Sequence, residues 1–161
     1  MTTTQSRKRV VERWFSAFNS GDTSQLAEIH DAECHNHAPG PFDSTVWPVS
    51  GKAFGPDEAA STINWLRQNM PDLNVRIESL LGEADQVVAW IRATGTPTGP
   101  GPIPPTGRRV DFAQAHRFRI SEHGRIVEHW AVRDDLLSML QSGAIDPPHR
   151  STAAAGSGDL S

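Results

Sequence analysis

The spacing of hydrophobic and polar residues changes once along the chain, near residue 70. Before that point, apolar residues recur every three or four positions, as in amphipathic helices. The helices predicted in this way span residues 6–18, 25–30 and 56–70. Asn19 to Asp22 separates the first two, because Asn and Gly tolerate the left-handed backbone that ends a helix. We therefore expect a helical hairpin, followed after an interval by a third helix.

The interval from Asp31 to Gly55 is rich in Pro, Gly, Ser and His and has no clear period. We expect a short strand or extended piece at Glu33–His37 and then a long loop. Structureless loops of this length in compact domains are usually functional. This one is predicted to be a lid over a site, with Phe42 and Trp47 as its apolar inner face, and Trp47 is expected to contact a substrate.

Beyond residue 72, apolar and polar residues alternate singly, which is typical of half-buried strands. The predicted strands span residues 73–79, 86–96, 109–120 and 125–133. A proline-rich connection at 97–107 separates the two predicted hairpins, and a short helix is expected at 134–141.

Helices that precede an antiparallel meander indicate an α+β fold. We expect a curved antiparallel sheet that wraps around the N-terminal helices and forms a conical α+β barrel with an internal pocket. Residues 1–145 are predicted to form a single domain, and residues 146–161 to be a disordered tail.

Composition narrows the function classes. The chain has 161 residues, of which 37% are hydrophobic and 21% charged, and a net charge of −4. These values favour a globular protein without a basic surface for nucleic acid. No segment is apolar over the ~20 residues that a membrane-spanning helix needs. Cys34 is the only cysteine, so no internal disulfide can form, and we expect a cytoplasmic location.

The chain has no tyrosine, so proton chemistry must use His, Asp, Glu or water. Strand alternation places Phe112, Gln114 and His116 on one face, and His129 on one face of the next strand. Histidine both takes and gives a proton near neutral pH, and glutamine can hold a carbonyl oxygen. We predict that these residues face a pocket. The alternative, polar residues on a half-exposed sheet, stays open at this point.

Two further polar groups are candidates. Asn36 and His37 are expected to bind a substrate by hydrogen bonds. Their spacing to neighbouring histidines matches no established metal-ligand pattern, so no metal is predicted. Asp134 is either the N-terminal cap of the last helix or a reserve catalytic carboxylate. Trp90 lies on a mixed strand face that suits either a pocket or a subunit interface.

Three segments, SAFNSGD, PIPPTGRRV and GRIVEHWAVRDDLLSMLQ, resemble the SnoaL-like polyketide cyclase (ester cyclase) family. The resemblance runs from about Val10 to Gly143 and implies the fold of ketosteroid isomerase and scytalone dehydratase. It also implies intramolecular aldol ring closure without cofactor or metal. The family's pocket residues fall on Asn36, Gln114 and His116, but its catalytic aspartate falls on Ala131, which cannot exchange protons.

These observations lead to a first hypothesis and two alternatives. The first is a cofactor-independent cyclase or isomerase of secondary metabolism, such as antibiotic biosynthesis, acting on a hydrophobic, oxygenated, polyketide-like substrate. His116 would be its acid–base group, His129 the partner, and Asp134 the reserve carboxylate. One alternative is a ligand-binding protein without catalysis. The other is an epoxide-opening cyclase or hydrolase, or a hydroxylase-type relative, with Asp134 or Asp43 at the cavity. Under each of the three hypotheses we expect a homodimer or homotetramer, as family members commonly are.

Overall fold

The computed structural model describes residues 3–38 and 52–147, and an α+β fold is built from them. The helices in these ranges are α1 (Thr4–Ser20), α2 (Leu26–Ile29), α3 (Pro56–Asn69) and α4 (Asp135–Ser142). The strands are β1 (His30–Asn36), β2 (Lys52–Ala53), β3 (Asn74–Glu83), β4 (Gln86–Gly95), β5 (Val110–Ile120) and β6 (Ile126–Arg133). Among the described residues, no helix is both long and apolar enough to cross a membrane.

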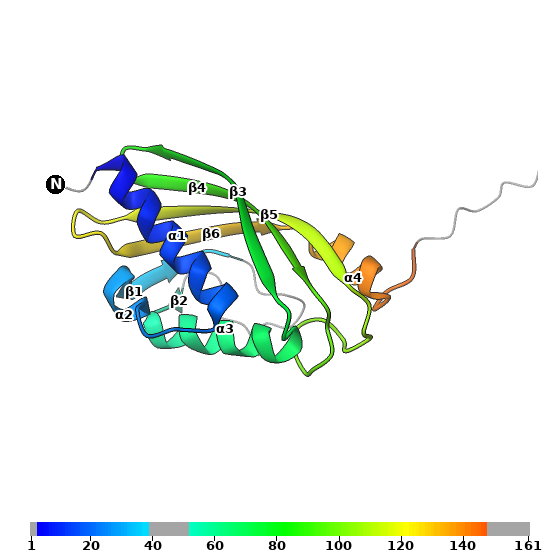
Figure 1. Cartoon of the computed structure of the whole chain (residues 1–161). Coiled ribbons are helices and arrows are strands. Elements are labelled where there is room, and N and C mark those ends of the chain that lie inside the picture. The colour runs from blue at the N-terminus through cyan, green and yellow to red at the C-terminus, as the bar shows by residue number, and fades with distance from the viewer. Residues whose placement is uncertain (1–2, 39–51, 148–161) are drawn as a thin grey trace, which may run out of the picture.

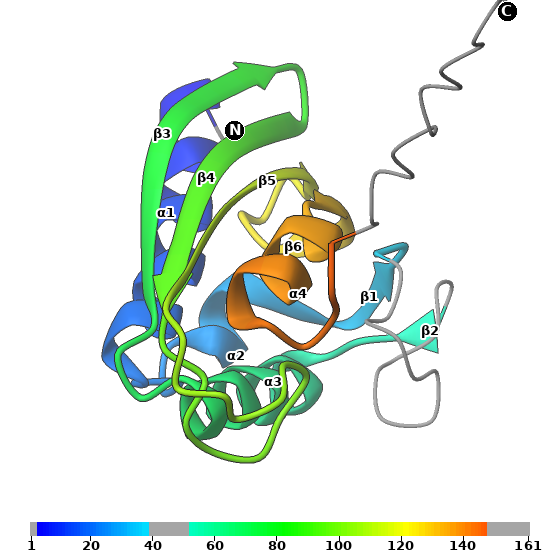
Figure 2. The ribbon, with the colours of Figure 1, turned by 90° about the vertical axis from the view of Figure 1, so that its right-hand side faces the viewer.

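The strands form one curved sheet in the order β2-β1-β6-β5-β4-β3. All neighbours pair antiparallel except β1 and β6, which run parallel. The predicted α+β fold, a curved sheet around the N-terminal helices, is confirmed. In detail the sheet is mixed, and over the described residues β2 and β3 are its separate edges. Figures 1 and 2 show the sheet curling over α1, with α3 along the open side and α4 at one end.

The core lies between α1 and the inner face of the sheet. Val11, Trp14 and Phe15 on α1 are 0–4% exposed. The ring centroid of Trp14 lies 5.1 Å from that of Phe118 on β5. On β4 the inner residues Val87, Ala89, Ile91 and Ala93 are all buried, as the alternation predicts. Gly21 ends α1 in the left-handed conformation, with φ 75°.

The segment after α1 differs from its prediction. The second helix has only four residues, and the chain is already extended at His30. His30 and Asn36 are paired with Ile126 and His129 of β6. This pairing supplies partners for the backbone groups that a longer helix would otherwise satisfy. The consequence is that β1 carries Asn36 to the centre of the molecule, where the strand borders β6. Most of the predicted lid, including Phe42, Asp43 and Trp47, lies outside the described residues.

Asn69, the last residue of α3, fixes the proline-rich connection. Its side-chain amide donates to the carbonyl oxygens of Gly99 and Ile103 at 2.7 and 2.8 Å. The backbone N–H of Ile103 donates to Asn69 Oδ1 at 3.3 Å. A Cβ at Gly101 would lie 2.3 Å from the Asn69 Cβ, so only glycine allows this close approach. The connection is thus held against α3, where Pro102 and Ile103 become part of a cavity wall.

Candidate active site

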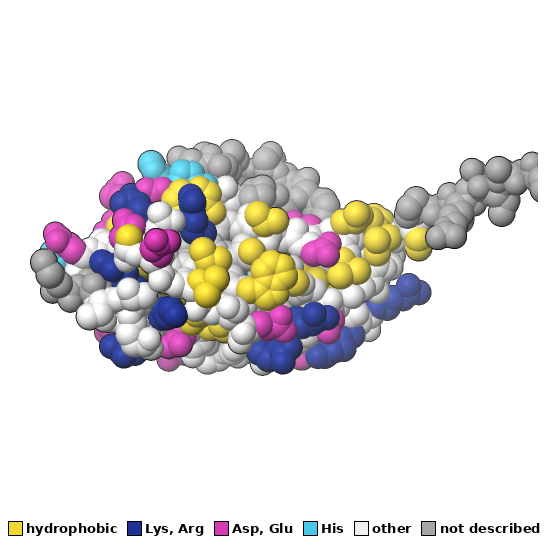
Figure 3. Space-filling view, turned by 90° about the horizontal axis from the view of Figure 1, so that it is seen from above, with side chains coloured by type: hydrophobic (Ala, Val, Ile, Leu, Met, Phe, Trp, Pro, Cys, Tyr) yellow, Lys and Arg dark blue, Asp and Glu magenta, His cyan; other side chains and the backbone are white. Residues whose placement is uncertain are grey.

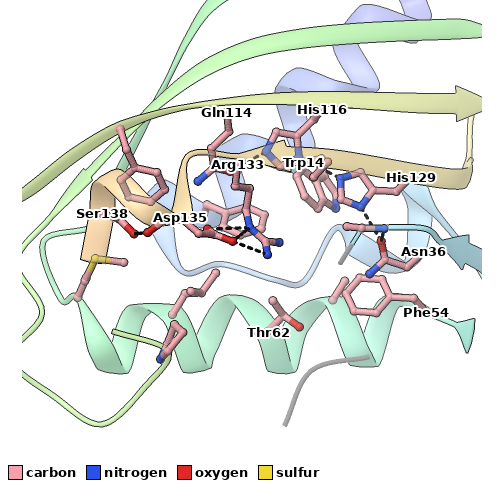
Figure 4. Close-up of a pocket in the computed structure, with 18 of the residues that line it drawn as sticks. Trp14, Asn36, Phe54, Thr62, Gln114, His116, His129, Arg133, Asp135 and Ser138 are labelled. Atoms are coloured by element: carbon pink, nitrogen blue, oxygen red, sulfur yellow. Dashed lines mark hydrogen bonds and ion pairs between the residues drawn. The ribbon is translucent and has the colours of Figure 1, made fainter. Parts of the chain in front are cut away.

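A cavity of about 110 Å³ lies between the inner face of β5 and β6 and the helices α1 and α3. Its wall is mostly apolar, and its polar side chains come mainly from β1, β5 and β6 (Figure 4). The lining residues are Trp14, Phe18, Asn36, Ala38, Phe54, Ala59, Thr62, Leu66, Met70, Pro102, Ile103, Phe112, Gln114, His116, His129, Ala131, Arg133, Asp135 and Ser138. An apolar cavity with a few converging polar groups is the usual form of a small-molecule site.

Four of the polar side chains form a continuous hydrogen-bonded chain. Gln114 Oε1 lies 2.8 Å from His116 Nε2. His116 Nδ1 lies 2.9 Å from His129 Nε2. His129 Nδ1 lies 3.0 Å from Asn36 Oδ1. All four nitrogen atoms of the two imidazole rings are therefore engaged, and the chain runs along the cavity wall from β5 to β1.

Strand geometry explains why these residues meet. Gln114 and His116 are two residues apart on β5, so both point to the inner face. On β6, Ala131 is opposite His116 and His129 is opposite Phe118. The two imidazoles are thus diagonal neighbours, within reach of each other across the strands. The parallel pairing of β1 with β6 then sets Asn36 beside His129.

Burial keeps both imidazoles neutral. His116 and His129 are 6% and 7% exposed. Loss of hydration disfavours the imidazolium form and, with the positive charge of Arg133, lowers the pKa of His116 to about 3. Burial also lowers the pKa of His129 well below its ordinary value, and the charge of a protonated His116 would lower it further. At neutral pH the pair therefore carries no charge.

The protons on the neutral pair can be assigned by starting from Asn36, whose amide orientation is fixed by the backbone. Asn36 Oδ1 accepts the backbone N–H of Ala38 at 3.1 Å, so it also accepts from His129 Nδ1. His129 Nε2 then has no proton and accepts from His116 Nδ1–H. His116 Nε2 is left with its lone pair. In the structure Gln114 Oε1 faces this atom, so the neutral pair requires the Gln114 amide turned by half a rotation, with its NH2 donating to Nε2. The reactive lone pair of the site is accordingly on His116 Nε2.

Protonation of the pair changes only the Gln114 end. A proton added to His116 Nε2 makes this atom a donor, and Gln114 Oε1, which faces it at 2.8 Å in the structure, accepts the hydrogen bond. All three contacts of the chain are then satisfied with one additional proton. Gln114 can thus support both the neutral and the protonated pair, which is what a group that alternately takes and gives a proton requires.

An ion pair forms a second polar feature of the cavity. Arg133, at the end of β6, donates from Nε to Asp135 Oδ1 and from a terminal nitrogen to Asp135 Oδ2, both at 3.1 Å. The side chain of Arg133 is 11% exposed and that of Asp135 is 31% exposed. Strand alternation puts Arg133 on the same face of β6 as His129, but no role was predicted for Arg133 from the sequence. Its alternation with His129 and Ala131 was the signal available.

The structure separates the predicted site residues into two groups. Asn36, Phe112, Gln114, His116 and His129 all line the cavity. The other described candidates, Asp134, His37 and Trp90, do not, and each has a physical reason.

Asp134 caps α4, where its carboxylate accepts the backbone N–H of Leu137 at 3.1 Å. The next residue, Asp135, provides the carboxylate in the cavity. His37 pairs with Glu128 at 3.1 Å and stacks on Trp130, with ring centroids 4.5 Å apart. Trp90 is 49% exposed, because the alternation of β4 turns it away from the buried Ala89 and Ile91. The predicted pocket roles of Asp134, His37 and Trp90 are therefore corrected.

Other reactive groups do not add to the site. Burial raises the pKa of the Cys34 thiol to about 12, so it is not a thiolate nucleophile at neutral pH. Over residues 3–38 and 52–147, no three His, Cys, Asp or Glu side chains gather in the way a metal site needs.

Comparison with known proteins agrees with this architecture. IdmH of Streptomyces antibioticus, a candidate polyketide cyclase, is 26% identical; the match covers 85% of this chain and 98% of IdmH, with a TM-score of 0.72. TsrD of Streptomyces laurentii is also 26% identical, with 90% and 100% covered and a TM-score of 0.75. AclR of Streptomyces galilaeus, a candidate hydroxylase, is 22% identical, with 91% and 87% covered and a TM-score of 0.72. AclR therefore shares the fold.

No curated protein matches the chain in sequence. The model of the SnoaL-like polyketide cyclase family, in contrast, matches residues 8–142, which is most of the protein. The matched range includes all four hydrogen-bonded side chains, those of Asn36, Gln114, His116 and His129. The family's α+β fold and its open, curved sheet are those of the structure. The chain belongs to the SnoaL-like polyketide cyclase family.

Proposed function

We propose that this protein is a cofactor-independent enzyme that moves a proton on a small, hydrophobic, oxygenated substrate and so closes a ring or isomerises it. The observation that carries the proposal is the buried, hydrogen-bonded histidine pair at the cavity, whose neutral form we assign with the lone pair on His116 Nε2. An uncharged imidazole has a free lone pair at neutral pH, and its lowered pKa also makes it a weaker base than an exposed histidine. Membership of the polyketide cyclase family supports a polyketide-like substrate of secondary metabolism.

The chemistry follows from the order of the hydrogen bonds. A substrate carbon acid displaces Gln114 from His116 Nε2 and transfers its proton there, while the electron pair of the C–H bond forms an enolate. The resulting imidazolium is stabilised by the Nδ1–H bond to His129, whose own Nδ1–H is held by Asn36. The enolate carbon then attacks a second carbonyl group, and His116 returns the proton to the new alkoxide. Return of the proton to a different carbon gives isomerisation instead.

Ala131 sets a limit on how this enzyme can work. It faces His116 across the two strands, where the family resemblance implies an acid–base aspartate. A methyl group there leaves the imidazole without a neighbouring carboxylate, so its low pKa is not raised by an opposite charge. In this chain His116 and His129 replace the aspartate as the acid–base group.

Solvent hydrogen exchange provides the test. The α-protons of 2-tetralone and of larger aromatic keto esters would be followed by NMR in heavy water, with and without protein. We expect His116→Gln to lower the protein-catalysed rate by about 10²–10⁴-fold, because general-base catalysis is worth that much. His123→Gln is the matched control, since His123 is exposed at the β5–β6 turn. Equal rates for wild type, His116→Gln and His129→Gln would contradict the proposal.

Two alternatives each have an observation in their favour. Ala131 favours a protein that binds such compounds without converting them; it predicts tight binding and no exchange with any substrate of the panel. Asp135 at the cavity favours opening of an epoxide, in which the carboxylate would activate water. That reaction would be lost in Asp135→Asn and kept in His116→Gln, the reverse of the first proposal.

We also propose that the outer face of the sheet joins two copies of the chain. Trp90, Ala115 and Val132 lie side by side on β4, β5 and β6, and Trp90 and Val132 are 49% and 75% exposed. Figure 3 shows hydrophobic side chains gathered on this face. Apolar patches of this kind commonly mark interfaces. Sedimentation of wild type and Trp90→Glu should show a dimer or tetramer and a monomer, respectively; a monomeric wild type would contradict the assignment.

A further inference from the structure

We propose that Arg133 binds the negatively charged oxygen of the substrate, so that the cavity selects compounds with an anionic or enolisable carbonyl oxygen at its Arg133 end. This inference rests on the proposed proton transfer and adds the side chain that stabilises the resulting negative charge on the substrate. It assigns a role to the one cationic side chain among the described residues that line the cavity.

The position of Arg133 fits this role. Gln114, which covers His116 Nε2, is directly opposite Arg133 in the pairing of β5 with β6. Directly opposed residues on one face have Cβ atoms about 5 Å apart, so the two side chains leave the same part of the cavity wall and a carbonyl group in the cavity can be near both. Figure 4 shows the guanidinium projecting from β6 toward α3, across the cavity and beside Asp135. A substrate whose acidic carbon is at His116 therefore places its carbonyl oxygen toward Arg133.

The charge of Arg133 acts on both partners of the reaction. It is the second cause, after burial, of the lowered His116 pKa, so its field reaches that ring. The same field that disfavours a cation on His116 favours an anion on the substrate. Proton transfer converts a neutral carbon acid into an enolate, and negative charge appears on the oxygen at the moment when His116 becomes positive. Arg133 thus stabilises the product of the step that His116 starts.

Asp135 orients the guanidinium without removing it from the cavity. Both carboxylate oxygens are bound, from Nε and from a terminal nitrogen, in the two-point geometry that fixes the plane of an arginine. The carboxylate is the more exposed member of the pair, 31% against 11% for Arg133. The positive end of the pair therefore lies deeper in the protein, and the negative end lies nearer to solvent.

The step balances without any additional reactant. The C–H bond breaks and an N–H bond forms on His116 Nε2. The released electron pair forms the C=C bond of the enolate, and the C=O π electrons move to the oxygen beside Arg133. No bond to Arg133 forms or breaks. The favoured substrates are therefore ketones, esters and 1,3-dicarbonyl compounds, and stable anions of similar shape should bind as mimics.

A matched pair of ligands tests the inference by binding alone. 2-Naphthoate carries the anion, and 2-naphthamide has nearly the same shape without charge. Titration calorimetry at pH 7.5 should show that wild type binds naphthoate at least about 10-fold more tightly, as a charge-assisted hydrogen bond predicts. Arg133→Gln should lose this preference and keep its affinity for naphthamide within about threefold. The naphthamide affinity shows that the variant still folds and still has its cavity.

Three further variants separate this proposal from the previous one. Arg117→Gln removes an arginine that covers Trp130 on the outer face and should leave both affinities unchanged. Arg133→Lys should keep part of the preference, because the charge remains but the two-point geometry is lost. His116→Gln should keep the preference for naphthoate even if catalysis is lost. A wild type without the preference, or an Arg133→Gln variant that retains it, overturns the assignment whatever the exchange assay shows.

Discussion

Acid should destabilise this protein because His116 is buried as a neutral ring. In the unfolded chain its pKa has the ordinary value of 6.5, whereas in the folded protein burial lowers it to about 3. Below pH 6.5 the unfolded state therefore binds a proton that the folded state does not bind. The free energy of unfolding falls as the pH decreases toward 3. From pH 7 to pH 5 the two pKa values correspond to a loss of about 2 kcal/mol from this one group.

Urea unfolding followed by tryptophan fluorescence at pH 7, 6 and 5 measures this loss. The fall in unfolding free energy between pH 7 and pH 5 should be smaller by about 2 kcal/mol in His116→Gln than in wild type. The comparison uses the change with pH, so any loss of packing caused by the substitution cancels. His30 and His129, whose pKa values burial also lowers, contribute loss of the same sign in both proteins.

The exposed His123 provides the control, because His123→Gln should have the pH dependence of wild type. If wild type and His116→Gln lost equal free energy between pH 7 and pH 5, His116 would titrate alike in the folded and unfolded states. The neutral, buried pair would then be refuted, and with it the assignment of the base.

Three substitutions test the walls of the cavity. Asn69→Ala removes the hydrogen bonds to Gly99 and Ile103, and urea unfolding should show a loss of about 2–4 kcal/mol; a loss below about 1 kcal/mol would mean that water replaces the amide. Gly101→Ala forces the connection away from Asn69 and should lower the unfolding free energy by about 1–3 kcal/mol, whereas no loss would contradict the close approach. Ala131→Asp places a carboxylate opposite the neighbouring imidazole, whose pKa should rise by about one unit or more in an NMR titration; an unchanged pKa would contradict the register.

Local sequence patterns predicted the parts of the fold that depend on near neighbours. Apolar residues at three- and four-residue spacing predicted α1 and α3, and Gly21 marked the end of α1. Single alternation predicted β4, β5 and β6 to within two residues, together with the buried face of β4. These features follow from side-chain direction and backbone preference, which a short window of sequence contains.

The parallel pairing of β1 with β6 was not predictable in this way. It joins His30 to Ile126 and Asn36 to His129, residues that are about 95 positions apart. No local pattern encodes such a pairing. The extended piece predicted at Glu33–His37 overlaps β1, but its partner was not predictable. His30, predicted to end a helix, also joins this strand, because β6 offers it hydrogen-bonding partners.

The residues of the candidate site also divide into those that local sequence predicts and those that it does not. His116 and Gln114 were predictable as neighbours, because they are two residues apart on one strand. Asp134 and Asp135 are adjacent acidic residues at the start of a helix, and sequence alone does not say which one caps it. The turn of about 100° per residue along a helix sends one carboxylate to the backbone of α4 and the other to Arg133. A single position therefore decides which acid lines the cavity.

The protonation of the histidine pair tests the central claim most directly. Long-range ¹H–¹⁵N correlation spectra of the imidazole rings at pH 7 distinguish protonated from bare ring nitrogens. We predict neutral rings, with protons on Nδ1 of His116 and of His129 and an unprotonated His116 Nε2. An imidazolium on either ring at pH 7, or a proton on His116 Nε2, would contradict the account, because the lone pair that is to accept the substrate's proton would be absent.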